Sequence, residues 1–368
     1  MIAKSIYNGT TEELLPLIEF DWVKILEENN VITIQKEDNT AETTTELNAI
    51  SFIENVGTIN NLIMTKNLAT NITFNLKDDE NLIVLAEQPT LASLNDALTG
   101  INNIGNGKLF GGIETATSTI DLRSNLTCEN VYFNHNCNFY QNSVLQNIIV
   151  GKNITTLGNN YFNYCKSLKT INLSNVSSLG EYCFATCTNL TTIDLSNVST
   201  IGIYCFYQCK NLSSIIFSSS LTSLNNNTFQ NCSSLTSLDI SNVSSIGNSC
   251  FNGCFKLEMF NGPNANSFGT YCFGNCSKLT SLNAPNVNSI DNNCFYYCTS
   301  LSELHIGVLT TCGTTIFNGV SQPINIYIHT TNLTDATNTA TTLNTNKGGT
   351  CTLTFYYGSD DNWTQITL

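Results

Sequence analysis

The stretch CFATCTNLTTIDLSNVSTIG, from Cys183 to Gly202, decides the fold because copies of it recur along the chain. Eight phenylalanines mark the copies, spaced 22 residues apart except for one step of 23. They are Phe162, Phe184, Phe206, Phe229, Phe251, Phe273, Phe295 and Phe317, and an outlying copy reaches back to Phe139. A cysteine lies three residues after each of the first seven, and a leucine six residues after. A register of this length predicts a repeat solenoid.

One unit can be interpreted from its pattern. Ile193 and Leu195 are two residues apart, so they point to the same side of a short strand while Asp194 faces solvent. The following Ser-Asn or Pro-Asn pair predicts a turn, in which asparagine tolerates the left-handed region. The segment around the phenylalanine then returns as an irregular or short helical arc. Stacking such coils about 4.8 Å apart through strand hydrogen bonds would bury a continuous core.

The units resemble the BspA-type leucine-rich repeats, often summarised as IGxxAFxxCxxLxxIxLPxxVxx. The resemblance covers about residues 139–320, and the best copies are LGEYCFATCTNLTTIDLSNVST (Leu179–Thr200) and IDNNCFYYCTSLSELHIGVLT (Ile290–Thr310). Two departures recur, since cysteine replaces the alanine before the phenylalanine and serine mostly replaces the proline. The resemblance implies a right-handed leucine-rich-repeat or β-solenoid array without catalytic machinery. It also implies the settings of the family, which are adhesins and surface proteins of gut or oral bacteria and parasitic protists, and some phage particles.

The sixteen cysteines invite three interpretations. Zinc is disfavoured, because the spacing is CxxxC instead of CxxC, and Tyr161 and Thr228 replace the first cysteine in two coils. Disulfides between neighbouring coils would fit the distance range of a bridge, but every coil uses the same positions, so no pairing is singled out. We favour a ladder of buried thiols that act as small hydrophobes and weak donors to backbone carbonyls.

The outward strand positions form the candidate binding face. Its residues are Thr170, Asn172, Thr192, Asp194, Ser237, Asp239, Asn261, Asn283, Glu303 and His305. The alternative is a plain solvated face. The spacing of Asp194 and Asp239 does not exclude an inverting carboxylate pair, but neither has an apolar pocket to raise its pKa. We therefore predict no catalytic residue, no metal ligand and no cofactor.

Composition limits the partners. The chain of 368 residues has 11% charged residues and a net charge of -14, which disfavours nucleic acid and anionic membrane surfaces. Nowhere do 18 apolar residues run together, so no membrane insertion is expected. The opening MIAKSIYNGTTEELLPLIEF lacks the apolar core of a signal peptide. We expect an extracellular-facing protein, on a virion or a cell surface, that arrives there without a signal peptide.

The two ends depart from the repeat. Residues 1–110 are expected to form a small mixed α/β domain that attaches the solenoid, forms a homo-oligomer or only caps it. Helical spacing is seen in residues 10–18 and 20–30, strands are expected at 31–35, 51–64 and 69–87, and a short helix at 93–105. Residues 111–150 are expected to be degenerate first coils and 151–320 the repeats. After Phe317 the register dissolves, and residues 321–368, with strands at 323–331 and 350–358 and a weak helix at 335–346, are expected to form a C-terminal cap.

Two functional hypotheses follow. The first is a non-enzymatic recognition or adhesion protein that binds a glycan or protein of a cell surface, including the receptor-binding protein of a virion. The second is a structural component of a phage particle, such as a tail, baseplate or head decoration, which contacts neighbouring virion subunits and is mounted through the N-terminal domain. An enzyme is disfavoured.

Overall fold

The computed structural model describes residues 139–150, 154–359 and 362–368, and nearer the N-terminus only the backbone of the strands between residues 4 and 138. The chain divides into two units. The N-terminal unit comprises Met1–Thr155 with Thr170–Asn175, and the repeat unit comprises Thr156–Lys169 with Val176–Leu368.

The N-terminal unit contains a nine-stranded sheet in the order β16-β14-β12-β10-β8-β6-β3-β4-β5. Adjacent strands are parallel from β3 to β16, whereas β4 and β5 continue the sheet antiparallel. The strands are β3 (Trp22–Glu28), β4 (Val31–Lys36), β5 (Ala41–Thr44), β6 (Asn61–Met64), β8 (Asn81–Ala86), β10 (Lys108–Ile113), β12 (Asn130–Phe133), β14 (Asn147–Val150) and β16 (Thr170–Asn172). Three smaller pairs are β1 (Lys4–Tyr7) with β2 (Thr10–Glu13), β7 (Ile72–Leu76) with β9 (Ile101–Gly105), and β11 (Ile120–Asp121) with β13 (Cys137–Asn138).

The helices predicted over 10–18 and 20–30 are wrong where the backbone is described, because β2 and β3 lie there. β3 pairs antiparallel with β4, with Glu28 opposite Val31. Strand pairing outweighs a weak helical pattern. The strand predicted at 31–35 is confirmed by β4, and those within 51–64 and 69–87 by β6, β7 and β8. In the helix predicted over 93–105, Ile101–Gly105 is a strand and the rest lies outside the described residues.

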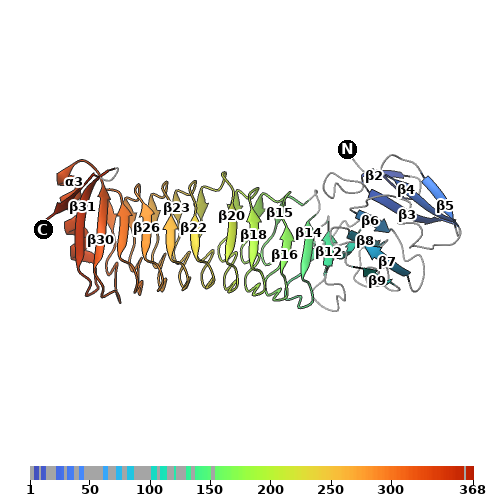
Figure 1. The fold of residues 1–368 in the computed structure, drawn as a ribbon, viewed down its shortest axis with the longest axis horizontal. Coiled ribbons are helices and arrows are strands. Elements are labelled where there is room, and N and C mark those ends of the chain that lie inside the picture. The colour runs from blue at the N-terminus through green and yellow to red at the C-terminus, as the bar shows by residue number, and fades with distance from the viewer. Residues whose placement is uncertain are drawn as a thin grey trace. The chain divides into compact units, whose positions relative to one another are not determined.

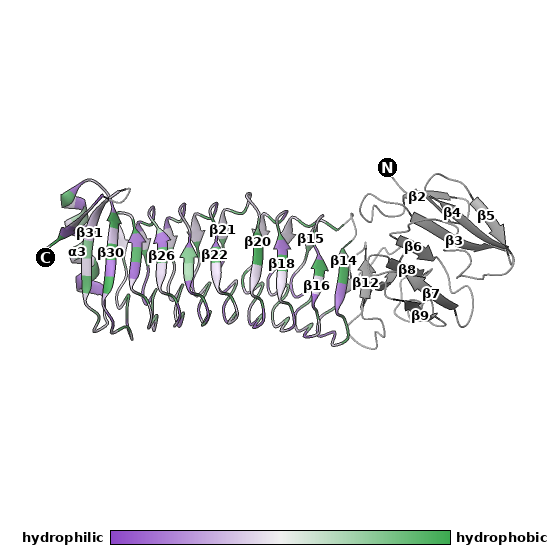
Figure 2. Ribbon diagram, in the orientation of Figure 1, coloured by the Kyte–Doolittle hydropathy of each residue, from purple (hydrophilic) through white to green (hydrophobic). Residues whose placement is uncertain are grey.

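In the repeat unit each coil contributes a main strand, a short strand and an arc that carries the phenylalanine (Figure 1). The main strands are β18 (Thr192–Leu195), β20 (Ser214–Phe217), β22 (Ser237–Asp239), β24 (Met259–Asn261), β26 (Ser281–Ala284), β28 (Glu303–Ile306), β30 (Ile324–His329), β31 (Leu353–Ser359) and β32 (Asn362–Ile366). The short strands are β15 (Thr156–Leu157), β17 (Ser178–Leu179), β19 (Thr200–Ile201), β21 (Ser223–Leu224), β23 (Ser245–Ile246), β25 (Ser267–Phe268), β27 (Ser289–Ile290) and β29 (Thr311–Cys312). Figure 2 shows hydrophobic and hydrophilic positions side by side along the main strands, as the predicted solenoid requires.

The main strands and the short strands are each divided into two sheets, and both divisions fall at the same coil. The main strands form a pair, β18-β20, and a seven-stranded sheet from β22 to β32, and the short strands break between β19 and β21. This coil contains the step of 23 residues from Phe206 to Phe229. Its extra residue lies between Phe217 and Ser223, where the turn is one residue longer than the turn between Leu195 and Thr200.

The eight phenylalanines of the solenoid form one continuous stack through the core. Consecutive rings from Phe162 to Phe317 have centroids 5.3 to 5.9 Å apart and are nearly parallel. The arc around each ring is irregular and not helical. In one coil Tyr182 and Thr186, on either side of Phe184, have φ of 54° and 61°. Their amides donate to Ile203 and Tyr207 of the next coil at 3.0 and 2.7 Å, and these hydrogen bonds offset the strain of the left-handed backbone.

The left-handed residues are therefore not those expected. Asn197 of the Ser-Asn turn has no positive φ. Instead, the amide of Val198 donates to the carbonyl of Leu195 at 2.9 Å, and the Asp194 Oδ1 accepts from the amide of Ser196 at 2.9 Å. These two hydrogen bonds close the turn without a left-handed residue.

The predicted donor role of the thiols is confirmed in six coils. The cysteine three residues after each phenylalanine donates its Sγ–H to the carbonyl of the phenylalanine one coil earlier, at 3.0 to 3.3 Å. The donors are Cys187, Cys209, Cys232, Cys254, Cys276 and Cys298. The fourteen cysteines whose side chains the structure describes form no disulfide, and all but Cys312 are buried. The sulfurs thus fill space and also link successive coils.

The C-terminal segment closes the open end of the core. Helix α3 (Leu333–Asn346) is capped by Asn332, whose side chain accepts from the amides of Thr334 and Asp335. Its buried face includes Thr339, whose hydroxyl accepts from the amide of Leu309 at 3.1 Å. The amide of Phe317, which would donate to another coil, donates to Lys347 at 2.7 Å instead. The predicted strands and helix of the cap are confirmed by β30, α3 and β31.

The expectation that the register dissolves after Phe317 is wrong for the main strand. Strand β30 pairs with β28 at the usual 22-residue offset, with Asn325 opposite Glu303 and Tyr327 opposite His305. The phenylalanine ladder ends there, but the hydrogen-bonded sheet extends through β30 and β31 and ends with the antiparallel strand β32.

Candidate binding surface

The seven-stranded sheet of the repeat unit presents three rows of outward side chains, which we call the strand face. Row 1 contains Ser237, Met259, Ser281, Glu303, Asn325 and Thr354. Row 2 contains Asp239, Asn261, Asn283, His305, Tyr327, Tyr356 and Gln365. Row 3 contains His329, Gly358 and Trp363. The rows follow from parallel pairing without slippage, which aligns equivalent positions of successive strands.

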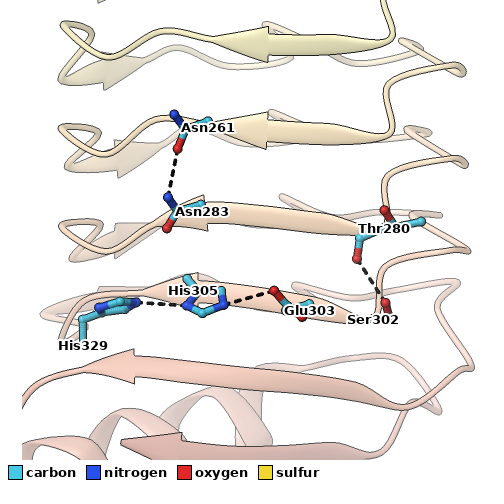
Figure 3. Close-up of polar contacts among 7 residues, drawn as sticks. All are labelled: Asn261, Thr280, Asn283, Ser302, Glu303, His305 and His329. Atoms are coloured by element: carbon cyan, nitrogen blue, oxygen red, sulfur yellow. Dashed lines mark hydrogen bonds and ion pairs between the residues drawn. The ribbon is translucent and has the colours of Figure 1, made fainter. Parts of the chain in front are cut away.

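Side-chain hydrogen bonds hold the first part of row 2 in place. The Nδ2 of Asn261 donates to the Oδ1 of Asp239 at 3.2 Å. The Nδ2 of Asn283 donates to the Oδ1 of Asn261 at 2.9 Å (Figure 3). Asp239 also accepts from the hydroxyl of Ser241 at 2.7 Å. Asp239 and Asn283 are exposed and Asn261 is half-buried, so an ordered amide ladder faces solvent.

The histidine at the end of this ladder is oriented from both sides. The Nε2 of His305 lies 3.1 Å from the Oε1 of Glu303, and its Nδ1 lies 3.0 Å from the Nε2 of His329 (Figure 3). An ionised Glu303 can only accept, so His305 donates from Nε2. When His305 is neutral, its Nδ1 then accepts from the Nε2–H of His329.

Three rings contact His305, and a fourth packs against one of them. Tyr327 is stacked on it with centroids 4.5 Å apart, and Tyr356 is stacked on Tyr327 at 5.0 Å. Trp363 makes edge contacts with His329, Tyr327 and His305 at 4.9, 5.0 and 5.7 Å. Burial, then the nearby Glu303 and Tyr356, raise the pKa of the Tyr327 hydroxyl, which remains neutral at physiological pH. We call His305, Tyr327, His329, Tyr356 and Trp363 the aromatic cluster.

The predicted candidate residues are divided among three places. Ser237, Asp239, Asn261, Asn283, Glu303 and His305 lie together on the seven-stranded sheet. Thr192 and Asp194 lie exposed on β18, which pairs only with β20 in its own sheet. Thr170 and Asn172 belong to the N-terminal unit, where the hydroxyl of Thr170 donates to the Oδ1 of Asn147 at 2.6 Å and the Oδ1 of Asn172 accepts from the amide of Ser174 at 2.9 Å.

The sequence interpretation missed four of the five residues of the aromatic cluster. Tyr327 could have been predicted from the sequence, because it lies 22 residues after His305 and follows the period. His329 is two residues further along the same strand. Tyr356 lies 29 residues after Tyr327 because α3 is inserted between their strands, and Trp363 lies on an antiparallel strand, so no period indicates either.

No metal centre or membrane-spanning segment emerges from the described part of the chain. Within it, His, Cys, Asp and Glu form no group of three or more that could hold a metal ion. Nor does this part contain a helix that is both long enough and apolar enough to cross a membrane.

A family model described as the BspA type leucine rich repeat region matches residues 132–258 and 244–344. None of the curated proteins matches the chain. Among solved structures, a leucine-rich repeat protein from Bacteroides ovatus is 16% identical with a TM-score of 0.41, covering 85% of this chain and 84% of that one. A leucine rich cell surface protein from Faecalibacterium prausnitzii is 15% identical with a TM-score of 0.37, covering 92% and 95%. A leucine rich repeat protein from T. pallidum is 20% identical with a TM-score of 0.36, covering 52% and 81%.

Proposed function

The chain belongs to the BspA-type leucine-rich repeat family, and we propose that it is a non-enzymatic recognition protein whose strand face binds a glycan or a protein outside the cell. The solenoid supplies a rigid frame, and the outward side chains of the main strands supply the contacts. Repeat arrays of this kind use extended surfaces of their coils for binding, which suits a large ligand better than a small one.

The contrast between the short strands and the main strands of the repeat unit carries the proposal. The first position of every short strand is serine or threonine, from Thr156 to Thr311. The outward positions of the main strands differ from coil to coil, and row 2 contains carboxylate, amide, imidazole and phenol groups. A uniform hydroxyl row can only repeat one contact, whereas a varied row on a rigid frame can distinguish one ligand from another.

The exposed apolar residues of the main strands add contact area. Met259 of row 1 is 57% exposed, and Ile216, on β20, is 56% exposed. Aromatic residues and methionine are enriched in binding surfaces, and the aromatic cluster lies on the same sheet as Met259. The carboxylates of Asp194 and Asp239 accept hydrogen bonds from Ser196 and Ser241 of their own turns. These hydrogen bonds orient the two carboxylates on the outward face.

The proposal is tested by binding of the fluorescent full-length protein to intact bacterial and epithelial cells, measured by flow cytometry. We expect a face variant, Asn283→Ala with Tyr356→Ala, to reduce binding at least about tenfold, since central aromatic contacts often dominate an interface. The matched control, Ser245→Ala with Ser289→Ala, changes two short strands of the opposite sheet and should bind as the wild type does. Equal binding by the face variant and the wild type would refute the strand face as the binding surface.

A further inference from the structure

The aromatic cluster is assembled by four strands at the C-terminal end of the strand face. His305 lies on β28, Tyr327 and His329 on β30, Tyr356 on β31 and Trp363 on β32. All five side chains are half-buried, so each is packed on one side and accessible on another. Because the rings also contact one another, their positions are fixed before any ligand arrives, which lowers the entropy lost on binding.

Gly358 lets Trp363 reach the other rings. In the sheet it lies between His329 and Trp363, pairing with both. Its φ is +149°, and a Cβ at this position would collide with the carbonyl oxygen of Asn362. The missing side chain leaves a gap in row 3, across which Trp363 contacts His329 at 4.9 Å. The arrangement therefore depends on a glycine in a conformation that other residues rarely adopt.

The charges of the strand face select against anions. Rows 1 to 3 contain two acidic side chains, Asp239 and Glu303, and neither lysine nor arginine. The whole chain has a net charge of -14. A sialylated, sulfated or phosphorylated ligand would find no fixed cation here and would be repelled by the acidic field. The ligand that fits this surface carries no negative charge.

The amide ladder beside the cluster retains capacity for hydrogen bonds. In Asn261 and Asn283 one of the two N–H groups donates along the ladder, which leaves the second for a ligand. The Oδ1 of Asn283 ends the ladder and accepts no hydrogen bond from the described residues. Paired donors and acceptors beside apolar ring surfaces match the hydroxyl groups and C–H faces of a pyranose.

We infer that row 2 binds a neutral, extended oligosaccharide that lies along the solenoid axis, with its end against Trp363 and Tyr356. Successive strands are about 4.8 Å apart, close to the length of one pyranose residue in an extended chain. From Asn261 to Tyr356 the row crosses five strands, so it offers about one contact for each of five sugar residues. The inference rests on the proposed function and names the ligand class of the same face.

The test uses an array of neutral oligosaccharides of hexoses and N-acetylhexosamines, with their sialylated and sulfated derivatives, probed with the full-length protein. We expect binding to neutral members only, with apparent affinity that rises from disaccharide to about pentasaccharide and then levels off. Trp363→Ala should weaken binding at least about tenfold, and Trp363→Phe should restore most of it because the ring face returns. Ser267→Ala, on the short strand β25, is the matched control and should bind normally. Circular dichroism melting curves confirm that each variant is folded.

Binding to no neutral member, a preference for the anionic derivatives, or full binding by folded Trp363→Ala would overturn the inference. Periodate oxidation of the cells used in the flow-cytometry experiment separates it from the proposed function. Cell binding that needs the strand face but survives periodate would retain the proposed function, with a protein as ligand, and overturn the glycan. Normal binding by the face variant would overturn the proposed function itself.

Discussion

The arc and the main strand of each coil differ in how much their residues vary. Along the arcs, the phenylalanine occurs in all eight coils and the cysteine three residues later in seven. Along row 2 of the main strands, the side chain changes from aspartate to asparagine, histidine and tyrosine. The two regions have the same spacing and pairing, so the difference comes from what their side chains contact.

Inside the solenoid, a side chain contacts its own copies in the coils before and after it. Phe251 is fully buried between Phe229 and Phe273, with centroids 5.9 and 5.5 Å away. A residue of another size would leave a cavity or collide with both neighbours, so the stack favours identical rings. An outward side chain such as Asn283 contacts solvent and one neighbour, and many residues satisfy that condition.

The largest expected effect is a fall in the stability of the solenoid at alkaline pH. Burial raises the pKa of nine core thiols, including Cys187, Cys254 and Cys276. In the unfolded chain their pKa is about 8.5, so above this pH the unfolded state loses protons that the folded state keeps. Stability is therefore fully present below about pH 8 and falls as the pH rises. From pH 7.5 to 9.5 the free energy of unfolding falls by about 1 kcal/mol for each thiol, on the order of 10 kcal/mol for the nine.

Urea denaturation at pH 7.5, 8.5 and 9.5, followed by circular dichroism under reducing conditions, measures this effect. The control is Cys254→Ala with Cys276→Ala, which removes two titrating thiols and should reduce the pH dependence by about two parts in nine. A denaturation midpoint that stays constant to pH 9.5 would show that the thiols titrate alike in both states.

Next in size is the removal of one ring from the stack. We expect Phe251→Ala to lower the free energy of unfolding by about 3–5 kcal/mol, because it removes a buried ring and leaves a cavity between two others. Ile216→Ala, at a side chain that is 56% exposed, is the matched surface control and should change stability by less than about 0.5 kcal/mol. Chemical denaturation at pH 7 compares them. Similar losses for both variants would contradict the contrast between arc and strand.

The same contrast explains how much could be predicted from the sequence. The period of Phe162 to Phe317 predicts the solenoid, its buried face and the outward positions, because a stack with one register repeats every contact. The left-handed residues of this coil could not be predicted, since Tyr182 and Thr186 are not residues that favour positive φ, although other coils have asparagine or glycine at the equivalent positions, such as Asn227 and Gly253. They adopt it because their amides donate to the next coil, and that partner exists only in the folded stack.

The candidate site could be predicted only as far as the period extends. Glu303 and His305 follow from the repeat, but their contact with His329 requires the pairing of β28 with β30. The gap at Gly358 and the position of Trp363 arise from an antiparallel hairpin after α3, outside any repeat. Near the N-terminus, residues 22–28 combine acidic residues with the strand-favouring Trp22, Val23 and Ile25, and pairing with Val31–Lys36 and Asn61–Met64 makes them a strand.

The smallest expected effect on stability is at the strand face, and it separates binding from folding most clearly. Asn283→Ala removes the hydrogen bond to Asn261 at 2.9 Å, but both side chains can then bond to water, so we expect a loss of less than about 0.5 kcal/mol. Asn248→Ala is the matched asparagine control on another side of the coil. Its Oδ1 accepts from the amide of Thr270 at 2.9 Å, so its removal should cost about 1 kcal/mol while leaving binding unchanged. Urea denaturation midpoints and cell binding are measured on both variants. Asn248→Ala should be the less stable of the two, whereas Asn283→Ala should be the weaker binder. If Asn283→Ala proves the less stable of the two and binds normally, the asparagines of row 2 are part of the frame, and recognition must depend on the aromatic cluster alone.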